Sequence, residues 1–502
     1  MFKQTRRLVP LCFINLCIVM SIGHAGGKSD APLLYYYSTI ENAFVIERGD
    51  GSEQRILTEF TIPQDCYAYD YCHISGPGWS PSGMWFAWTV QNNARLPVEQ
   101  ATVNIVDRTG NQRLNLEQLR GVESLQWSPT NDLLLIERYT AEESGYEYYL
   151  WRSTLQNPQL WLKHDGSSMM KWLPSGDYLV VYSVQGDETN LEVFDTEGAL
   201  VWRRVVHPLV DATNSAFCVP QWSTNDTIAY IAPNSALILE NLSDTIQYEF
   251  DFIDNYLIHI DWDTSGEYAI VYSNDTCDYT RGSYNLSLIS LPDQMILNLS
   301  PSARLLLNSC FFCPSTVWAE GGRHGVYFDQ QLHPFTASPL EIYDIDILSN
   351  PDTFVSGNLW HWFNDDVLAF YDAQSLDVPT ISVFNFTTGV VNNLLSSGST
   401  VHNFFISPEN GYIALPNYSE CRGICIVDIL EREEYRIESL DYGIEEVFWD
   451  PTEHWFFFLG NPIGNSRQVG IAKTDGTIVR RLPDWYDLTS SSGFGWMPAE
   501  LS

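Results

Sequence analysis

Tryptophan recurs along this chain within one fixed pattern of apolar and polar positions. In "QWSPTNDLLLIERY", which starts at Gln126, a Trp is followed by a short polar sequence and then by an apolar run. Pro, Ser, Thr, Asn, Asp and Gly favour tight turns, because they preset φ or satisfy the backbone locally. The residues after them are mainly aliphatic and aromatic, as in strands. Each copy of this pattern therefore predicts a strand, a tight turn and a second strand.

Ten stretches share this pattern at nearly regular spacing. The anchor positions are 79, 127, 172, 222, 262, 318, 362, 406, 449 and 496; position 406 holds Ile and the other nine hold Trp. The mean separation is about 46 residues, which indicates a repeat architecture. A repeat overrides the estimate of about three domains that the chain length alone would suggest.

The region between two anchors contains further strand and turn signals. Apolar stretches such as "ATVNIVD" from 101 and "NLEVFD" from 190 predict a third strand. Asp- and Gly-containing sequences often follow, as in "DRTGN" from 107 and "KTDGT" from 473, and these favour a second tight turn. A fourth strand and a longer connection then lead to the next anchor. Four strands in about 45 residues are typical of one β-propeller blade.

The units resemble the WD40-like blades of TolB-type propellers and the N-terminal propellers of prolyl-oligopeptidase-type peptidases. The resemblance lies in a W-S-P-[ST]-[GN] sequence before an apolar strand, as in "GWSPSG" from Gly78 and "QWSPTN" from Gln126. It extends over nearly all of the chain after residue 25, and it implies that each anchor Trp packs between blades. No G-x-S-x-G motif occurs, so the peptidases' activity is not implied.

We predict an all-β fold: a β-propeller of about ten Trp-anchored, four-stranded units of about 46 residues each. No strands follow the last anchor, Trp496, whereas residues 32–60 look like the later strands of one unit. Pairing of these terminal strands would close the ring and remove an exposed sheet edge. One large ring or two smaller propellers both fit the repeat, although propellers usually have four to eight blades.

The two faces of such a propeller carry different connections. We label the strands of each unit A to D from the centre outward. The A–B and C–D turns are short and lie together on one face, the plain face. The B–C and D–A connections form the opposite, loop-rich face, with long loops at 60–76, 92–101, 140–147, 274–284, 308–315 and 418–423. Because loops on a rigid scaffold often carry function, we expect binding on the loop-rich face, at the mouth of the central channel.

The first residues have the pattern of an export signal. Lys3, Arg6 and Arg7 precede a mostly apolar stretch over 8–22, and small residues lead to a predicted cleavage site after Ala25. The apolar stretch is shorter than the roughly 20 residues needed to span a bilayer. We therefore expect a secreted or periplasmic protein without membrane insertion after signal cleavage. The predicted division is a signal peptide at 1–25, a short linker at 26–32 and the propeller repeats at 33–502.

The composition restricts the partners of the folded protein. Hydrophobic residues make up 45% of the chain and aromatic residues 14%, which excludes a disordered chain. The formal net charge is −37, and removing the predicted signal, with three basic and no acidic residues, leaves −40. Such a surface repels phosphate backbones, so we expect no nucleic-acid partner. We expect a monomer that binds a protein, peptide or glycan.

The cysteines indicate disulfides. Eight of them follow the predicted signal: Cys66, Cys72, Cys218, Cys277, Cys310, Cys313, Cys421 and Cys425. An even number is typical of disulfides in an exported protein, and all eight lie in or next to connections of the loop-rich face. Pairing of close neighbours would join 66 with 72, 310 with 313 and 421 with 425, leaving 218 with 277. Eight cysteines allow 105 connectivities, and "CFFC" at 310–313 could instead be redox-active or hold a metal.

The sequence contains no motif for catalysis, and we predict no catalytic, cofactor-binding or metal-binding residues. His361 and His402 lie near inner strands, where a channel residue could sit, but a structural role is the simpler interpretation. The acidic pairs at 365–366 and 445–446 lie in or near turns, with bound Ca²⁺ as the alternative to solvated turn residues. "RGD" at 48–50 lies in a strand–turn–strand sequence, so we interpret it as a turn and not as an adhesion motif.

Two functions of different classes fit this sequence. The first is an exported, non-catalytic β-propeller scaffold that binds a protein, peptide or glycan through its loop-rich, cysteine-bearing face. The alternative is an extracytoplasmic enzyme, a glycan hydrolase or lyase, with its active site at the channel mouth. Acidic or basic side chains gathered at the inner ends of the A strands would favour the enzyme. A third possibility, implied by the TolB-type resemblance, is an accessory part of an envelope complex.

Overall fold

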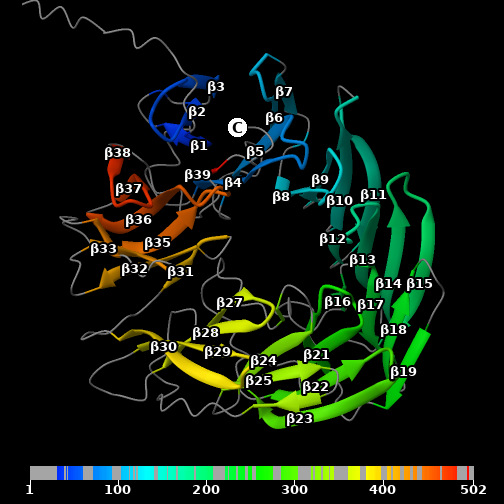
Figure 1. Cartoon of the computed structure of the whole chain (residues 1–502). Coiled ribbons are helices and arrows are strands. Elements are labelled where there is room, and N and C mark those ends of the chain that lie inside the picture. Colours follow the sequence, from blue (N-terminus) through cyan, green and yellow to red (C-terminus); the bar gives the residue numbers. More distant parts are fainter. Residues whose placement is uncertain are drawn as a thin grey trace, which may run out of the picture.

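Figure 1 shows the chain as a computed structural model in which sheets are arranged side by side around a common axis. Among the described residues all regular structure is β-strand. The structure describes residues 31–38, 41, 43–59, 72–92, 103–111, 113–116, 119, 122–140, 145–154, 157–165, 168–185, 188–206, 221–223, 225–232, 236–242, 247–251, 256–274, 284–303, 318–319, 323–328, 332–337, 340–343, 360–372, 380–396, 404–408, 411–418, 423–429, 434–437, 444–463, 466–482 and 494–496.

Blades 1 to 5 follow one another along the chain, and each is a four-stranded antiparallel sheet with its strands in sequence order. Blade 1 comprises β4 (Cys72–Trp79), β5 (Trp85–Asn92), β6 (Val103–Asp107) and β7 (Arg113–Leu116). Blade 2 comprises β8 (Val122–Trp127), β9 (Leu133–Thr140), β10 (Gly145–Arg152) and β11 (Gln159–Asp165). Blade 3 comprises β12 (Ser168–Trp172), β13 (Tyr178–Gln185), β14 (Glu188–Asp195) and β15 (Leu200–Val206). Blade 4 comprises β16 (Gln221–Trp222), β17 (Thr227–Ile231), β18 (Ala236–Asn241) and β19 (Gln247–Asp251). Blade 5 comprises β20 (Tyr256–Trp262), β21 (Tyr268–Asn274), β22 (Tyr284–Ser290) and β23 (Met295–Ala303).

Blades 6 to 10 continue the series. Blade 6 comprises β24 (His324–Phe328), β25 (Leu332–Ala337) and β26 (Leu340–Ile342). Blade 7 comprises β27 (Trp360–Asn364), β28 (Val367–Asp372), β29 (Thr380–Asn385) and β30 (Val390–Ser396). Blade 8 comprises β31 (Phe405–Ile406), β32 (Tyr412–Tyr418), β33 (Gly423–Asp428) and β34 (Glu434–Ile437). Blade 9 comprises β35 (Ile444–Trp449), β36 (Trp455–Ile463), β37 (Ser466–Lys473) and β38 (Ile478–Leu482). Blade 10 comprises β39 (Phe494–Trp496) with β1 (Leu33–Ser38), β2 (Ala43–Arg48) and β3 (Arg55–Glu59).

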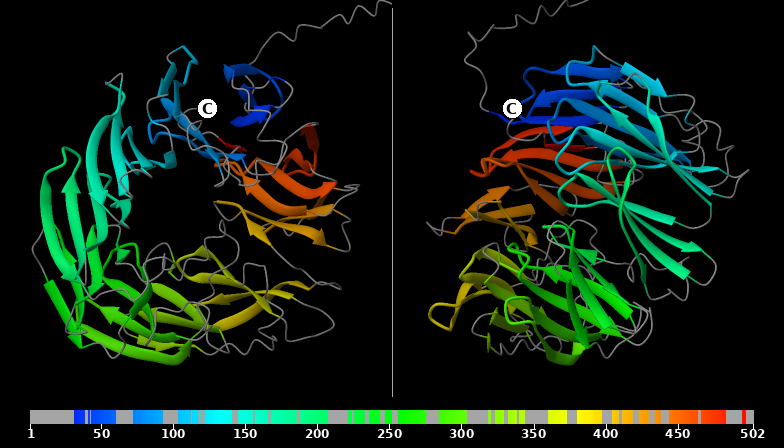
Figure 2. Two further views of the ribbon diagram at one scale, coloured as in Figure 1. Left: turned by 180° about the vertical axis from the view of Figure 1, so that it is seen from behind. Right: turned by 90° about the vertical axis from the view of Figure 1, so that its right-hand side faces the viewer.

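The ten blades form one ring, as both views of Figure 2 show. Ten clusters of buried apolar side chains hold it together, and each cluster draws its members from two neighbouring blades. The series runs from blades 1 and 2 to blades 9 and 10, and then from blade 10 back to blade 1. The predicted ten-bladed propeller is therefore confirmed, and of the two arrangements that fit the repeat it is the single ring.

Blade 10 is a composite of both ends of the repeat region, as predicted. Strand β39 pairs antiparallel with β1, with Leu34 opposite Trp496 and Tyr36 opposite Phe494. On one side this blade packs against blade 9, where Phe457 contacts the ring of Trp496 at 5.6 Å between centroids. On the other side Tyr37 and Phe44 belong to the cluster shared with blade 1. Pairing of the terminal strands closes the ring by hydrogen bonds as well as by packing.

Blade 6 departs from the predicted four strands. Among the described residues it has three, and its inner position is represented by a single bridge between Trp318 and Gly325. The anchor nevertheless keeps its role, because Trp318 is buried in the cluster shared with blade 5 and meets Phe335 edge-on at 5.3 Å. Packing of the anchor Trp is thus retained where strand pairing is reduced to one bridge.

The anchor tryptophans link neighbouring blades by hydrogen bonds. The indole N–H of Trp127 donates to the carbonyl of Gly78, which directly precedes the anchor of blade 1, at 3.0 Å. Trp172 repeats this contact toward blade 2, donating to the carbonyl before Trp127 at 3.2 Å. Trp318 and Trp496 make the same bond to the blade before them, at 3.0 and 3.1 Å. The predicted inter-blade role of these residues is therefore confirmed.

The residue after each anchor organises the A–B turn. In several blades it is a buried Ser or Asp, and its side chain accepts a backbone N–H from the end of the turn. Ser407 accepts from Tyr412 at 2.9 Å, and Asp450 accepts from Trp455 at 2.7 Å. Turn residues also join adjacent blades: the hydroxyl of Thr130 in blade 2 donates to the carbonyl of Ser175 in blade 3 at 2.6 Å. The plain face is therefore a continuous structural surface along these blades.

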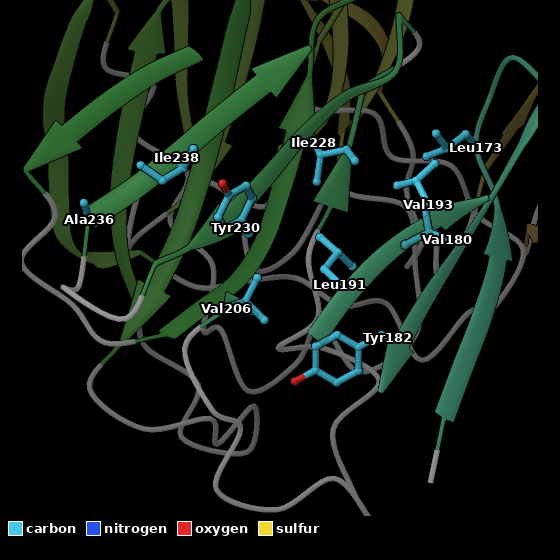
Figure 3. Close-up of a cluster of buried hydrophobic side chains, with 10 residues drawn as sticks. All are labelled: Leu173, Val180, Tyr182, Leu191, Val193, Val206, Ile228, Tyr230, Ala236 and Ile238. Atoms are coloured by element: carbon cyan, nitrogen blue, oxygen red, sulfur yellow. The ribbon is translucent and has the colours of Figure 1, made fainter. Parts of the chain in front are cut away.

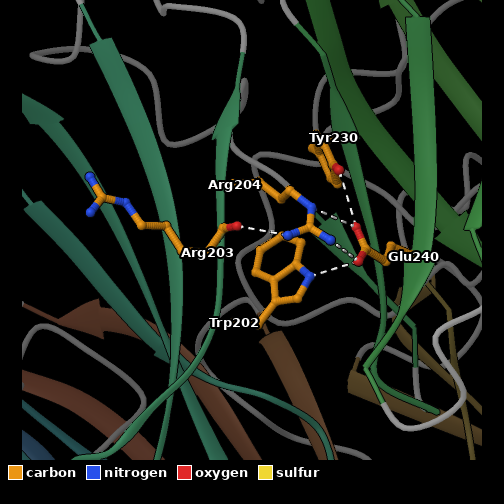
Figure 4. Close-up of polar contacts among 5 residues, drawn as sticks. All are labelled: Trp202, Arg203, Arg204, Tyr230 and Glu240. Atoms are coloured by element: carbon orange, nitrogen blue, oxygen red, sulfur yellow. Dashed lines mark hydrogen bonds and ion pairs between the residues drawn. The ribbon is translucent and has the colours of Figure 1, made fainter.

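The interface of blades 3 and 4 shows how a blade pair combines apolar and polar packing. Figure 3 shows Val180 and Leu191 of blade 3 facing Ile228 and Tyr230 of blade 4 in a shared buried cluster. Polar groups lie beside this cluster (Figure 4), where the carboxylate of Glu240 is buried. This arrangement shows that a charged residue is accommodated in the core between two blades.

Donors from two blades surround Glu240. From β15 the guanidinium of Arg204 donates to both carboxylate oxygens, at 2.5 and 3.2 Å, and the indole N–H of Trp202 donates at 2.8 Å. From β17 the hydroxyl of Tyr230 donates at 3.2 Å. A buried carboxylate needs this degree of pairing because its desolvation is unfavourable. These contacts join the outer strand of blade 3 to the middle of blade 4.

Candidate functional site

The loop-rich face is reached in the structure through the ends of its B and C strands. The long loops predicted to carry binding lie mostly outside the described residues. Strands β9 and β10 of blade 2 are described up to Thr140 and from Gly145, next to one of these loops. Their last polar residues therefore give the best described view of the predicted binding face.

Tyrosines and a glutamate gather on the side of blade 2 that faces blade 3. Tyr139 and Tyr146 are opposite each other on β9 and β10, with ring centroids 5.3 Å apart. Tyr148 lies 6.3 Å from Tyr146 in a stacked arrangement and packs in the cluster shared with blade 3. Glu137 is opposite Tyr148, whose hydroxyl donates to it at 3.5 Å. Tyr139 is 36% exposed, so solvent reaches this aromatic group.

The inner strand adds a second glutamate to this group. Ser124 on β8 donates its hydroxyl to Glu137 at 2.6 Å. The pairing register of β8 and β9 shifts between Val122 and Ser124, which makes Glu123 the extra residue of a β-bulge. A bulge re-aims side chains and is common beside binding sites. Glu123 is exposed and lies close enough to Glu137 for their charges to interact.

Both glutamates hold their protons more tightly than usual. Burial raises the pKa of Glu137, and the hydrogen bonds from Ser124 and Tyr148 offset this only in part. Burial also raises the pKa of Glu123, and the charge of Glu137 adds to the effect. Two carboxyl groups with raised pKa values are a common feature of functional sites, although they also occur in structural networks.

The opposite side of blade 2 provides an informative contrast. There Glu147 is bound by Lys163, by Arg138 at 3.4 Å and by the hydroxyl of Tyr149 at 2.7 Å. Burial opposes the charge of Glu147, but these partners outweigh it and lower the pKa of its carboxyl group. The side of blade 2 that faces blade 1 thus has cations that neutralise its buried glutamate, so that glutamate needs no ligand.

We name the group on the side that faces blade 3 the blade 2 polar wall. It comprises Glu123, Ser124, Glu137, Tyr139, Tyr146 and Tyr148.

A histidine and an aspartate lie on the inner strand of blade 5. His259 Nε2 is 3.1 Å from Asp261 Oδ1, and the ring of Tyr272 lies 6.1 Å from the imidazole. Burial opposes protonation of His259, but the hydrogen bond and charge of Asp261 outweigh it and raise the pKa of the imidazole. Burial raises the pKa of Tyr272 far above its usual value. Blades 3 and 4 separate this group from the blade 2 polar wall, so the two do not form one site.

A Thr–His–Asp arrangement bridges blades 6 and 7. His324 Nδ1 lies 2.9 Å from the hydroxyl of Thr336, and His324 Nε2 lies 3.3 Å from Asp366. In a nucleophilic triad the hydroxyl is accessible and the carboxylate is buried. Here Thr336 is 5% exposed while the Asp366 side chain is 55% exposed. The order of burial is reversed, so this arrangement is a contact between blades on the plain face.

The structure describes only some of the residues that the sequence analysis singled out. Cys425 is buried on β33 and disulfide-bonded, but the structure does not describe its partner. Cys72 begins β4, with nothing known of its side chain, and Cys66, Cys218, Cys277, Cys310, Cys313 and Cys421 lie outside the described residues. The predicted cysteine pairing therefore stays a prediction. His361 lies on β27 and His402 is outside the described part of the chain.

The two acidic pairs differ in position: residues 365–366 form the turn between β27 and β28, as predicted, whereas residues 445–446 lie inside strand β35 and are not turn residues. Asp366 contacts His324, as described above. In the "RGD" sequence Arg48 ends β2, and residues 49–50 begin the predicted turn to β3, in which Gly51 has a φ of 82°. The guanidinium of Arg48 donates to the carbonyl of Ala31 at 2.7 Å and pairs with Glu53 at 3.1 Å. Arg48 is 8% exposed, so it is not presented for recognition by another protein.

The described part of the chain shows neither a cluster of metal-ligating side chains nor a membrane-spanning helix. No group of three or more His, Cys, Asp or Glu side chains in the described ranges is placed to hold a metal ion. The described segments also include no helix that is long and apolar enough to cross a membrane.

The blade 2 polar wall was not predicted from the sequence. The stretch "IERYTAEESGYEYY" at 136–149 is rich in Glu and Tyr, which is the only signal it offers. Alternation along β9 and β10 decides which of these residues share a side. That alternation sends Glu137 and Tyr139 toward blade 3 but Arg138 and Glu147 toward blade 1. The pairing register of β9 and β10 is therefore needed to decide which of these residues face blade 3 and which face blade 1.

Comparisons with known proteins give likenesses of fold only. No protein-family model matches the chain, and no curated protein matches it. The β-propeller domain of the Trilobed protease from Pyrococcus furiosus is similar over 84% of this chain and 98% of that one, at 13% identity and a TM-score of 0.35. The tricorn protease is similar over 88% of this chain and 49% of its own, at 10% identity and a TM-score of 0.27.

TolB from Acinetobacter baumannii is similar over 59% of this chain and 77% of that one, at 13% identity and a TM-score of 0.23. Identities and TM-scores this low carry no argument about activity or partners. The assignment of the fold rests on the sheets and the clusters between them. The chain is a single-ring, ten-bladed β-propeller with Trp-anchored blades, the kind of blade that its resemblance to the TolB type implied.

Proposed function

We propose that this protein is an exported, non-catalytic β-propeller that binds a protein, peptide or glycan through its loop-rich face. The observation that carries the proposal is the blade 2 polar wall. Its exposed Tyr139 lies where β9 runs into a loop of that face, and its exposed Glu123 lies on the neighbouring strand β8. Tyrosines are enriched at the energetic centres of binding surfaces, and loops on a rigid scaffold commonly carry binding sites.

Export is supported by the sequence and by one cysteine. The predicted signal at 1–25 would direct the chain out of the cytoplasm. Cys425 is disulfide-bonded, and disulfides persist mainly in oxidising compartments. The net charge of −37 favours basic or neutral partners over nucleic acids. We propose a secreted or periplasmic location and a monomeric state.

Replacement of loops tests the binding face. The mature chain is compared with a variant in which residues 60–71 and 419–422, the parts of two long loops that lie outside β4, β32 and β33, are replaced by short Gly-Ser linkers. The comparison uses affinity capture from an extracytoplasmic extract. The control replaces the plain-face turn 107–111 in the same way. We expect capture to be lost with the first variant and kept with the control. Equal capture by all three proteins would refute the loop-rich face as the binding surface.

An enzyme that cleaves glycans is the second candidate, and the paired glutamates favour it. A general acid in glycoside hydrolysis needs a raised carboxyl pKa, which Glu137 and Glu123 both have. The test is release of reducing ends from a panel of polysaccharides by the wild-type protein and by Glu137→Gln. Activity that is present in the wild type and lost in the variant would establish the enzyme. No release by the wild type would leave the scaffold as the function.

A further inference from the structure

Two buried polar groups of blade 3 have no hydrogen-bond partner within the part of the chain that the structure describes. They are the hydroxyl of Ser183 and the side-chain amide nitrogen of Asn190. Ser183 is 0% exposed and Asn190 is 1% exposed, and the two residues are directly opposite each other on β13 and β14. A buried polar group that lacks a hydrogen bond destabilises the fold because its desolvation is not compensated, so such a pair calls for a partner.

The orientation of the Asn190 amide is fixed. Arg203 on β15 donates to the amide oxygen from Nε at 3.2 Å and from Nη2 at 2.9 Å. A guanidinium only donates hydrogen bonds, so the oxygen of the amide must face Arg203. The nitrogen therefore points away from Arg203 and remains available as a donor.

Ser183 and Asn190 face blade 2. Side chains alternate along a strand, and Leu179 and Val181, four and two positions before Ser183, pack in the cluster shared with blade 2. The same cluster contains Tyr148 of the blade 2 polar wall. Ser183 is one alternation step beyond Val181 toward the loop-rich face, as Tyr146 is beyond Tyr148. The free donor and hydroxyl of blade 3 thus lie on the same interface as the wall's tyrosines and glutamates.

The chemistry of the two sides selects the ligand. Asn190 requires an acceptor, whereas the carboxylates of Glu123 and Glu137 accept hydrogen bonds, and Ser183 serves as donor or acceptor. A cation would suit the glutamates but leave the amide nitrogen unpaired, and an anion would be repelled by both glutamates. A sugar hydroxyl both donates and accepts, and the apolar C–H face of a sugar ring can pack against tyrosine rings. A neutral sugar suits every one of these groups.

We propose that the interface of blades 2 and 3 near the loop-rich face is a binding site for an uncharged sugar unit of a glycan. Tyr139 and Tyr146 pack on the sugar ring, Glu137 accepts hydrogen bonds from its hydroxyls, and Asn190 donates one. This assignment rests on the proposed binding function and names one ligand class for it.

Titration calorimetry with neutral hexasaccharides tests the assignment. The probes are maltohexaose, cellohexaose and chitohexaose, added to the whole mature chain. Asn190→Asp keeps the oxygen for Arg203 but replaces the amide donor, and Tyr139→Ser removes a part-exposed ring that packs against Tyr146. The control is Tyr149→Phe, on the opposite side of blade 2. We expect at least one hexasaccharide to bind, with about tenfold or greater weakening in both variants and no change in the control.

Three results would overturn the sugar site. They are an absence of binding by every hexasaccharide, equal binding by wild type and both variants, and equal weakening by the Tyr149 control. The first is the result expected if a trapped water is the only partner of Ser183 and Asn190. Thermal unfolding of each variant shows that it is folded before it is titrated. Failure here, with loop-dependent capture intact, removes the sugar site alone and leaves the proposed binding function standing.

Discussion

Trp127 and Trp449 occupy the same anchor position in blades 2 and 9 but differ in one hydrogen bond. The indole N–H of Trp127 donates to Gly78, whereas that of Trp449 is buried without a partner in the described structure. Trp127→Phe loses a hydrogen bond as well as ring area, and Trp449→Phe loses ring area alone. We expect Trp127→Phe to be the more destabilising by about 1 kcal/mol. Urea unfolding of the two variants measures this difference, and equal losses would deny the bond a net contribution.

Removing Arg204 and removing the charge of Glu240 should affect the stability of the protein to different degrees. Arg204→Met leaves a buried carboxylate without its cation, a change that typically costs about 3–5 kcal/mol. Glu240→Gln leaves Arg204 unpaired, but that side chain is 42% exposed and can be hydrated. We therefore expect Arg204→Met to lower the free energy of unfolding more than Glu240→Gln does. The reverse order in chemical denaturation would show that burial of the carboxylate does not decide the stability of this contact.

Two histidines should change stability with pH in opposite directions. Burial lowers the pKa of His324, and Asp366 offsets this only in part, so the unfolded chain binds the proton more tightly and stability falls as pH drops below about 6.5. The raised pKa of His259 does the reverse: its contribution is present below about 6.5 and is lost as pH rises through the raised pKa.

The two histidines can be separated by substitution. Relative to wild type, His324→Asn should become more stable on going from pH 7.5 toward pH 5.5, and His259→Asn should become less stable. Denaturant midpoints measured across this range provide the comparison. Parallel curves for the two variants would contradict the assigned pKa directions.

Single residues were predictable where the repeat fixes their surroundings. The role of the anchor Trp could be read from the sequence, because a polar turn and an apolar strand follow it in most copies of the repeat. The blade 2 polar wall could not be predicted from the sequence. It depends on which residues β9 and β10 place on the same side of the sheet and on the position of the bulge in β8. The proposed sugar contact of Asn190 depends further on Arg203, thirteen positions away, whose hydrogen bonds fix the orientation of the Asn190 amide.

At the scale of the element, the A–B turn depends on a buried acceptor after the anchor. Asp450 accepts the backbone N–H of Trp455, as Ser407 does for Tyr412 in blade 8. Asp450→Ala leaves buried N–H groups unpaired and should lower stability by about 1–3 kcal/mol. Asp450→Ser reproduces the turn of the other blade and should retain most of it. Calorimetry of both variants is the test, and equal losses would mean that the carboxylate acts by its charge.

Strands and turns were predictable because each has a local signal, and the turn that begins at residue 49, after β2, forms as expected. Blade 6 was less predictable. Its anchor Trp318 matches the repeat, yet only one bridge represents the inner strand among the described residues. The repeat marks where a blade lies, but strand pairing depends on the neighbouring backbone, which a single sequence does not report.

At the scale of the whole molecule, closure of the ring depends on three residues. Deleting 494–496 removes β39, its pairing with β1 and the Trp496 contacts with blade 9. We expect a lower melting temperature and faster hydrogen exchange in β1, whose inner edge becomes unpaired. Exchange followed by mass spectrometry localises the effect. Unchanged protection of β1 would show that packing against blades 1 and 9 closes the ring without β39.

The number of blades could be counted from the sequence, but the number of rings could not. Each blade packs through two sides, and the anchor pattern does not state which other blade it meets. The cluster that joins Tyr37 and Phe44 of blade 10 to Phe86 of blade 1 decides the matter. That contact joins parts of the chain that only the closing sheet brings together.

The composite blade also determines the order in which the molecule can be completed. Strands β1 to β3 are synthesised first, but their sheet gains its inner strand only when β39 has been made. Until then the growing chain is an arc with two unsatisfied ends, one of them the bare edge of β1, and bare edges favour aggregation. A chain of this design is suited to being kept unfolded until β39 has been made. Transport as an unfolded chain, followed by a single closing step at its destination, would avoid the exposed arc altogether.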